Sequence, residues 1–204
     1  DKILNKNLFK ILIAAGVIIT PVLLSPMPRF NSPLATVVEA CDGSLLGARI
    51  ADDGQWRFPS FDQIPEKFEK SLLVYEDRWF YYHPGVNPVA IIRALRSNIK
   101  AREIVSGGST ITMQISRLAR GNRKRTYFAK GAEILSALKL ELYKSKKAIL
   151  LMYSANAPFG GNTVGIEAAA WRYTGKSSSE LSWAEAATLA VLPNSPALIY
   201  PGKN

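Results

Sequence analysis

After Pro59 the sequence is punctuated as a series of capped helices, and this pattern most restricts the folds open to the chain. Asn87-Pro88 places a capping residue before a proline and predicts a helix to about Ala101. Ser182 to Glu185 has the form of a capping box, which opens a helix to Leu192. Further helices are expected over residues 68–75, 109–120, 125–143 and 163–173, and after Ser145. No alternation of strands and helices suggests a parallel sheet, so the sequence predicts a mainly α domain.

The residues before this domain have a different character. Residues 11–28 carry no charge and follow three lysines. This pattern predicts that residues 1–30 form a transmembrane anchor with a cytoplasmic N-terminus. A cleaved signal peptide is the alternative. Short β-like runs around Asp42-Gly43 and Asp53-Gly54 predict a β-meander linker over residues 31–60, to which we assign no chemistry. Residues 61–204 form the predicted main domain, which we expect to be incomplete at its C-terminus.

The net charge of +10 indicates an anionic partner. No acidic residue lies between Glu103 and Glu133, a window that holds Arg117, Arg120, Arg123, Lys124, Arg125 and Lys130. The glycine-rich residues 106–110 stand just before these cations and could cradle a phosphate at a helix start. A flexible loop followed by a solvated basic face is the alternative. Nucleic acid is disfavoured because aromatics are not interleaved with the cations. One cysteine and one histidine exclude a disulfide framework and make a zinc site improbable.

Two acidic residues are candidates for proton transfer. Glu76 follows an amphipathic helical pattern, and a carboxyl set against apolar surface has a raised pKa that suits a general base. The alternative for Glu76 is a solvated charge beside an aromatic cluster. Glu133 lies on the helix predicted over residues 125–143, although spacing alone would allow Glu103 or Glu141 equally well.

The motifs together resemble a known family. Glu76-Asp77-Arg78-x-Phe80-x-x-His83-x-Gly85 is similar to the first signature of the peptidoglycan glycosyltransferases, glycosyltransferase family 51, found in class A penicillin-binding proteins. The second signature is similar to Gly107-Gly108-Ser109-Thr110-Ile111-Thr112-Met113-Gln114, and the third to Lys130-x-x-Glu133. A later one is similar to Ala157-Pro158-Phe159-Gly160-Gly161. The resemblance extends over residues 42–202.

This resemblance implies a lysozyme-like helical domain outside the plasma membrane, in the periplasm or extracellular space. The domain would polymerise lipid II into β-1,4-linked glycan with inversion and release polyprenyl diphosphate. Glu76 would be the general base, and Glu133 would lie near the donor pyrophosphate. The implied donor-binding residues are Ser109, Thr110, Gln114, Arg117 and Lys130. The implied supporting residues of the first signature are Asp77, Arg78, Phe80, His83 and Gly85. The resemblance leaves room for a divalent metal, Mg²⁺ or Mn²⁺, and implies no organic cofactor.

The implied partners are a lipid II donor and acceptor, the inner membrane, the cell-wall synthesis machinery and a C-terminal transpeptidase domain absent from this chain. Two positions depart from the family pattern. Ala129 stands where many members have arginine, a role that Arg123 or Arg125 could take, and Asn156 lies one place later than usual, after Ala155.

Three other functions remain to be weighed. A transpeptidase is disfavoured because Ser97-x-x-Lys100 and Ser154-x-Asn156 have no Lys-Thr-Gly partner. A domain that binds anionic wall polymers without catalysis is the second alternative. The third is a muralytic enzyme that cleaves finished glycan.

Overall fold

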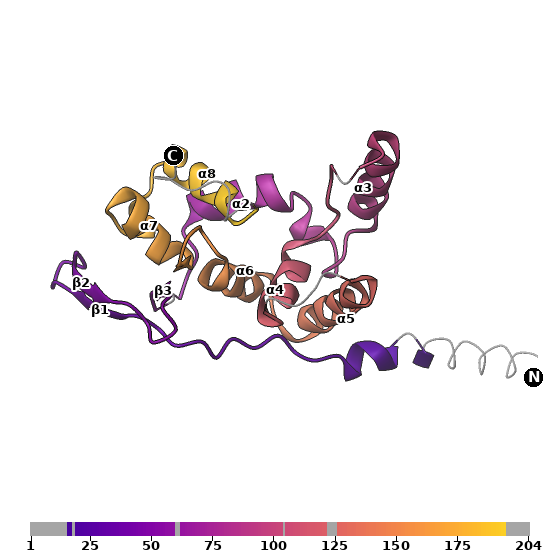
Figure 1. The fold of residues 1–204 in the computed structure, drawn as a ribbon, viewed down its shortest axis with the longest axis horizontal. Helices are drawn as coiled ribbons and strands as arrows, with labels where there is room; N and C mark the ends of the chain where they lie inside the picture. The colour runs from indigo at the N-terminus through magenta and orange to yellow at the C-terminus, as the bar shows by residue number, and fades with distance from the viewer. Residues whose placement is uncertain (1–15, 18, 60–61, 104, 122–125, 195–204) are drawn as a thin grey trace, which may run out of the picture.

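The computed structural model describes residues 16–17, 19–59, 62–103, 105–121 and 126–194, and this part of the chain is mainly helical (Figure 1). Its named helices are α2 (Glu66–Glu76), α3 (Pro88–Ala101), α4 (Ile111–Ala119), α5 (Tyr127–Tyr143), α6 (Lys146–Asn156), α7 (Ile166–Thr174) and α8 (Trp183–Val191). Short 3₁₀ turns occupy Phe80–Tyr82, Ser178–Glu180 and Leu192–Asn194. The predicted mainly α architecture is confirmed.

Helix α4 lies at the centre of the domain and packs against both α5 and α6. Six consecutive residues, Ile111 to Ser116, are buried. The helix can be buried on all sides because it carries no charge before Arg117. Its polar side chains are satisfied inside: Thr112 donates to Glu141 at 2.7 Å, and the Ser116 hydroxyl donates to the carbonyl of Thr112. The core thus surrounds the helix that carries the second signature.

The helix caps agree with the sequence. The side chains of Asn87, Ser145 and Ser182 each accept a hydrogen bond from a backbone amide in the first turn of their helices. Ser182 forms the predicted capping box with Glu185. The prediction for α7 is wrong at its start, because the helix begins at Ile166 and not at Thr163.

The predicted β-meander is correct for its first two strands and wrong for the third. β1 (Thr36–Glu39) and β2 (Leu45–Arg49) form the expected antiparallel hairpin around Asp42-Gly43. β3 (Trp56–Arg57) does not continue this hairpin but pairs in parallel with β4 (Thr163–Val164), where the helical pattern was expected to start. A two-residue strand carries too little pattern to specify its partner, and here the partner lies a hundred residues away.

Residues 1–15 and 18 of the predicted anchor lie outside the described part of the chain. Among the residues that the structure describes, no helix combines the length and apolar character needed to cross a membrane. The chain around residues 23–26 is bound to α5 by side chains of that helix. Lys139 Nζ donates to the carbonyls of Leu23 and Ser25 at 2.6 and 2.7 Å, and the Ser136 hydroxyl donates to that of Pro26 at 3.0 Å. Residues 22–32 are called the N-terminal strap below.

Helix α3 stands apart from the other helices (Figure 1). Ala94 is its only buried residue, and large apolar side chains on it are exposed: Val89, Ile91, Ile92, Leu95 and Ile99. The side chain of Asn98 bonds the backbone of Val105 and Ser106, which ties the glycine-rich loop to α3. Gly108 permits a close crossing, because a Cβ there would lie 2.8 Å from Ile91 Cα.

Candidate active site

Glu76 is the last residue of α2, and its carboxyl group is half-buried beside α4. Its Oε2 accepts a hydrogen bond of 2.6 Å from Gln114 Nε2. Its Oε1 is buried and has no hydrogen-bond partner among the described residues. Burial raises the pKa of Glu76, and this outweighs the lowering effect of the Gln114 hydrogen bond and of the Arg117 charge. The negative end of the α2 dipole acts in the same direction as burial. Glu76 thus ends a helix and has a raised pKa, as the sequence predicted.

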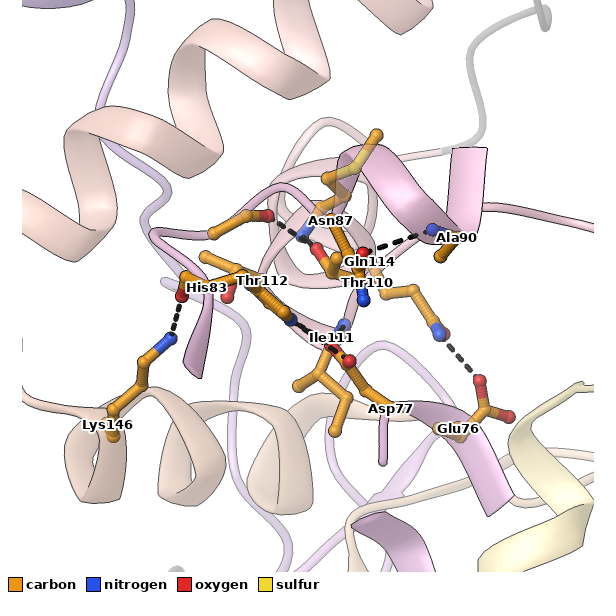
Figure 2. A network of polar contacts seen from close by, with 12 residues as sticks. Glu76, Asp77, His83, Asn87, Ala90, Thr110, Ile111, Thr112, Gln114 and Lys146 are labelled. Carbon is orange, nitrogen blue, oxygen red and sulfur yellow. Dashed lines mark hydrogen bonds and ion pairs between the residues drawn. The ribbon is translucent and has the colours of Figure 1, made fainter. Parts of the chain in front are cut away.

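Asp77 and His83 of the first signature hold the loop after α2 in place (Figure 2). His83 Nε2 lies 3.0 Å from both carboxylate oxygens of Asp77, and both side chains are buried. Asp77 Oδ2 also accepts from the amide of Ile111 at 3.1 Å, which places an anion at the positive end of α4. His83 and Asp77 thus brace α2 against α4.

Lys146 of α6 secures the same loop from the opposite side. Its Nζ donates to the carbonyl of His83 at 2.7 Å and to Glu141 at 2.8 Å, and lies 4.4 Å from the ring centroid of the buried Phe80. Gly85 has a φ of +87°, and a Cβ there would lie 2.9 Å from the Ala137 carbonyl oxygen. Any other residue at this position would be strained and crowded. Arg78 is exposed to solvent and is not part of the hydrogen-bond network described here.

The third signature meets the glycine-rich loop. Lys130 Nζ donates to Ser109 Oγ at 2.6 Å and to Glu133 Oε2 at 3.2 Å. Lys130 and Glu133 lie one turn apart on α5, so they share a face. Glu133 is buried, whereas the Lys130 side chain is 42% exposed and can reach a ligand. The three side chains form a compact polar group in which the Lys130 ammonium is partly exposed to solvent.

The side chains of Thr110 and Glu141 make structural hydrogen bonds within the protein. The Thr110 hydroxyl donates to the carbonyl of Gly85 and accepts from the amide of Met113, so it caps α4 and is buried. Glu141 is occupied by Thr112 and Lys146, and Glu103 is exposed. Of the three acids that spacing allowed, only Glu133 lines the cleft described next.

Gln114 and Glu133 line a cleft of about 780 Å³, together with Arg117, Arg120 and Asn156. Glu76 is not part of the lining and contacts it through Gln114. Arg120 donates to the carbonyl of Ala129 at 2.8 Å. Ala129 is the residue that stands where many family members have arginine. Arg123 and Arg125, the expected substitutes, lie outside the described residues. The charged side chains that line the described cleft are three arginines and Glu133, which suits a substrate with several negative charges.

Part of the cleft wall was missed from the sequence. Phe30, Ser32, Gln55 and Arg57 contribute to it, although we assigned no chemistry to residues 31–60. Arg57 is buried, donates to the carbonyl of Pro33 at 2.6 Å and pairs with Asp53 at 3.0 Å. An arginine between two aromatic residues, Trp56 and Phe58, was the one available signal. Tyr153 also lines the cleft and was not predicted as a site residue.

The described residues contain no cluster of three histidine, cysteine or acidic side chains that could by itself hold a metal ion. A Mg²⁺ ion is commonly held by one carboxylate together with substrate phosphates. Glu133, buried in the cleft wall and the one acidic side chain in its lining, fits that more limited requirement.

Comparison with known proteins adds an independent observation. Residues 43–204 match the family described as Transglycosylase. Penicillin-binding protein 1C of Escherichia coli is 44% identical over 182 residues, which cover 88% of this chain and 23% of that protein. Penicillin-binding protein 1A of Aquifex aeolicus is 44% identical over 175 residues, or 86% and 24%. Penicillin-binding protein 4 of Bacillus subtilis is 34% identical over 163 residues, or 80% and 26%. The chain spans about a quarter of the length of these relatives.

Proposed function

We propose, from the premise that the chain belongs to the transglycosylase family of class A penicillin-binding proteins, that it is a peptidoglycan glycosyltransferase of bacterial cell-wall synthesis. Its substrate is lipid II, which serves both as donor and as acceptor. The observation that carries the proposal is a half-buried carboxyl group of raised pKa, bound by Gln114, which lines a cleft with three arginines. A base and a binding site for a charged leaving group are the two elements that this transfer needs.

The proposed reaction is a single displacement. The 4-hydroxyl of the acceptor sugar attacks the anomeric carbon of the donor, and a new C–O bond forms there. The bond from that carbon to the pyrophosphate oxygen breaks, and polyprenyl diphosphate leaves with the bonding electron pair. The configuration inverts from α to β, and the hydroxyl proton passes to the base.

Glu76 is the proposed base. Its buried Oε1 has no partner among the described residues and is therefore available to accept a proton. Its raised pKa makes the carboxylate more basic than an exposed one, while Gln114 and Arg117 favour its ionised form. A bound hydroxyl at Oε1 would supply the missing hydrogen bond.

The proposed site for the leaving group is formed by Lys130, Ser109 and Arg117. Charge accumulates on the pyrophosphate as the bond breaks, and positive groups fixed in advance stabilise it. Glu133 would orient Lys130 and would hold a divalent ion together with the pyrophosphate oxygens. Such an ion would neutralise phosphate charge.

We also propose a lysozyme-like arrangement of the domain and a location at the outer face of the plasma membrane, with the N-terminal segment as its anchor. The exposed apolar side chains of α3, with Tyr127 and Phe128 at the start of α5, support a position beside lipid. A transpeptidase domain and the cell-wall synthesis machinery are proposed partners, from the relatives' common name and greater length.

The test compares lipid II with finished glycan as substrate. We expect labelled lipid II to be consumed with release of polyprenyl diphosphate, and finished glycan to remain intact. Glu76→Gln should lower the rate about 10²–10⁴-fold, and Glu133→Gln about 10²-fold or more. Glu66→Gln on the same helix is the matched control, because Glu66 is exposed, pairs with Lys70 and does not line the cleft.

Each alternative has its own outcome. Consumption of glycan instead of lipid II would indicate a muralytic enzyme. If Glu76→Gln and Glu133→Gln both polymerise lipid II at the parent rate, the roles assigned to these two acids are refuted. Binding of anionic wall polymer without any turnover would leave a non-catalytic domain.

A further inference from the structure

The orientation of the Gln114 side-chain amide determines whether Glu76 faces a hydrogen-bond donor or an acceptor. Gln114 is 7% exposed, so its amide must find partners inside the protein. Its Nε2 donates to Glu76 Oε2 at 2.6 Å, and its Oε1 accepts from the hydroxyl of Tyr153 at 3.4 Å. Each end of the amide thus faces a different group.

An amide can rotate by half a turn and exchange its oxygen and nitrogen. If Gln114 did so, its oxygen would face the Glu76 carboxylate, which repels it when ionised and binds it only when protonated. The amide orientation therefore selects the protonation state of the carboxyl group. A residue that holds the nitrogen toward Glu76 keeps the group ionised and able to accept a proton.

Tyr153 meets the requirement for such a residue. It lies on α6 and is 1% exposed, so the protein encloses almost all of its side chain. Burial, aided by the Glu76 charge, raises the pKa of Tyr153 above its usual range, so the hydroxyl retains its proton. Among the described residues, Gln114 Oε1 is the acceptor for that proton. With the amide reversed, the hydroxyl proton would face an NH₂ group and lose this acceptor.

We propose that Tyr153 is a positioning residue for the reaction: its hydroxyl donates to Gln114 Oε1 and so keeps the Gln114 amide nitrogen directed at Glu76. This inference rests on the proposed role of Glu76 as the base. Tyr153 does not transfer the proton itself. It acts through Gln114 and couples α6 to the end of α2 across the central helix.

Other charges near Glu76 act without an orientation requirement. Arg117 of α4 lowers the pKa of Glu76, and Asp77, the next residue in the chain, raises it. Helix α8 packs against α2, and its one charged residue, Glu185, is bound at its N-terminal end by Ser182 and Lys176. These groups remain in place when the Tyr153 hydroxyl is removed, so a change in pH dependence can be assigned to the amide.

The experiment measures kcat/KM for lipid II polymerisation against pH in Tyr153→Phe. The variant retains the buried ring and loses only the hydroxyl. We expect the acidic limb of the profile to move to higher pH by about 0.5–1 unit, because the freed amide can now stabilise protonated Glu76. The shift is read from the pH midpoint of the limb, so it is independent of the absolute rate on the high-pH plateau.

A double-variant comparison shows whether Tyr153 acts through Gln114. In a Gln114→Met background the amide is gone, so Tyr153→Phe should cause no further shift of the limb. Tyr173→Phe is the matched control, because its hydroxyl donates to the carbonyl of Phe159 at 3.0 Å and does not line the cleft. It should lower thermal stability and leave the acidic limb unchanged.

Site-specific replacement of Tyr153 by 3-fluorotyrosine provides a test in the opposite direction. The fluorinated hydroxyl is a stronger donor, so the acidic limb should move to lower pH, and this form keeps the hydrogen bond if Tyr153→Phe does not fold. An unmoved limb in both proteins overturns the inference, as does an equal shift with and without Gln114. If the parent protein itself shows no polymerisation at any pH, the proposed function fails instead.

Discussion

The carboxyl group of Glu76 lies under influences of opposite sign. Burial and the end of α2 disfavour its charge, whereas Gln114 and Arg117 favour it. The balance leaves a carboxylate that is basic but still bound by a donor on one oxygen. An exposed acid would be a weaker base, and a buried acid without donors would stay protonated. The same balance should also cost the fold stability.

Replacing Glu76 should therefore stabilise the domain at neutral pH. Its pKa is raised in the folded state, so ionisation costs stability above that raised value and nothing below the ordinary value of 4.5. We expect Glu76→Gln to raise Tm at about pH 8 by on the order of 2 °C. The difference should shrink as the pH falls toward the ordinary value, which thermal melts across this range would measure.

Glu66 provides the comparison of opposite sign on the same helix. Its hydrogen bond with Lys70 lowers the pKa of its carboxyl group, so its ionised form favours the fold at neutral pH. Glu66→Gln should leave Tm unchanged or slightly lower. A lower Tm for Glu76→Gln at neutral pH would contradict the destabilising effect assigned to this carboxylate.

At the scale of elements, capping residues proved the most informative part of the sequence. Asn87, Ser145 and Ser182 each act locally, so their effect does not depend on what the helix later packs against. The start of α7 could not be predicted this way. Thr163 belongs to a strand because Trp56 pairs with it, and that contact joins distant parts of the chain.

The strap depends on the same kind of distant contact. Lys139 Nζ binds two carbonyls of the strap, those of Leu23 and Ser25, and the following residues Phe30 and Ser32 line the cleft. We expect Lys139→Met to release this segment. Proteolytic cleavage or hydrogen exchange within residues 22–32 should become faster, and the KM for lipid II should rise about two- to tenfold while kcat changes less.

Lys147→Met is the matched control, because Lys147 is exposed on α6 and makes no hydrogen bond to the strap in the part of the chain that the structure describes. It should leave both exchange and KM at parent values. If Lys139→Met frees the strap without any change in KM, the strap does not contribute to substrate binding.

At the scale of the whole molecule, the site combines a part visible in the sequence with a part that was hidden. The Glu76–Gln114 and Lys130–Glu133 contacts join residues of recognisable motifs, and the structure brings them together. Arg57 belongs to no such motif. It reaches the cleft because β3 pairs with β4 and because Pro33 and Asp53 hold its guanidinium. Such placement follows from tertiary contacts and cannot be deduced from spacing.

The cationic cleft predicts a dependence on ionic strength. Raising NaCl from about 0.1 to about 1 M shortens the screening length from about 10 to about 3 Å. We expect the KM for lipid II in neutral detergent to rise several-fold, because the pyrophosphate is attracted by Arg117 and Arg120 from a distance. The value of kcat should change little, since contacts inside the closed complex are less screened. Arg117→Gln should show a smaller salt dependence, and a constant parent KM would contradict this assignment.

The cleft also determines when the site can exist during synthesis of the chain. Phe30 and Asn194 both line it, although nearly the whole described chain separates them. A chain leaving the ribosome could form the Glu76–Gln114 contact once α4 has emerged, yet the cleft lining is complete only after residue 194 has followed. Contacts between residues so far apart in sequence form late. The nascent domain would therefore hold its base in place well before it could enclose a substrate, and activity would begin abruptly with the last turn.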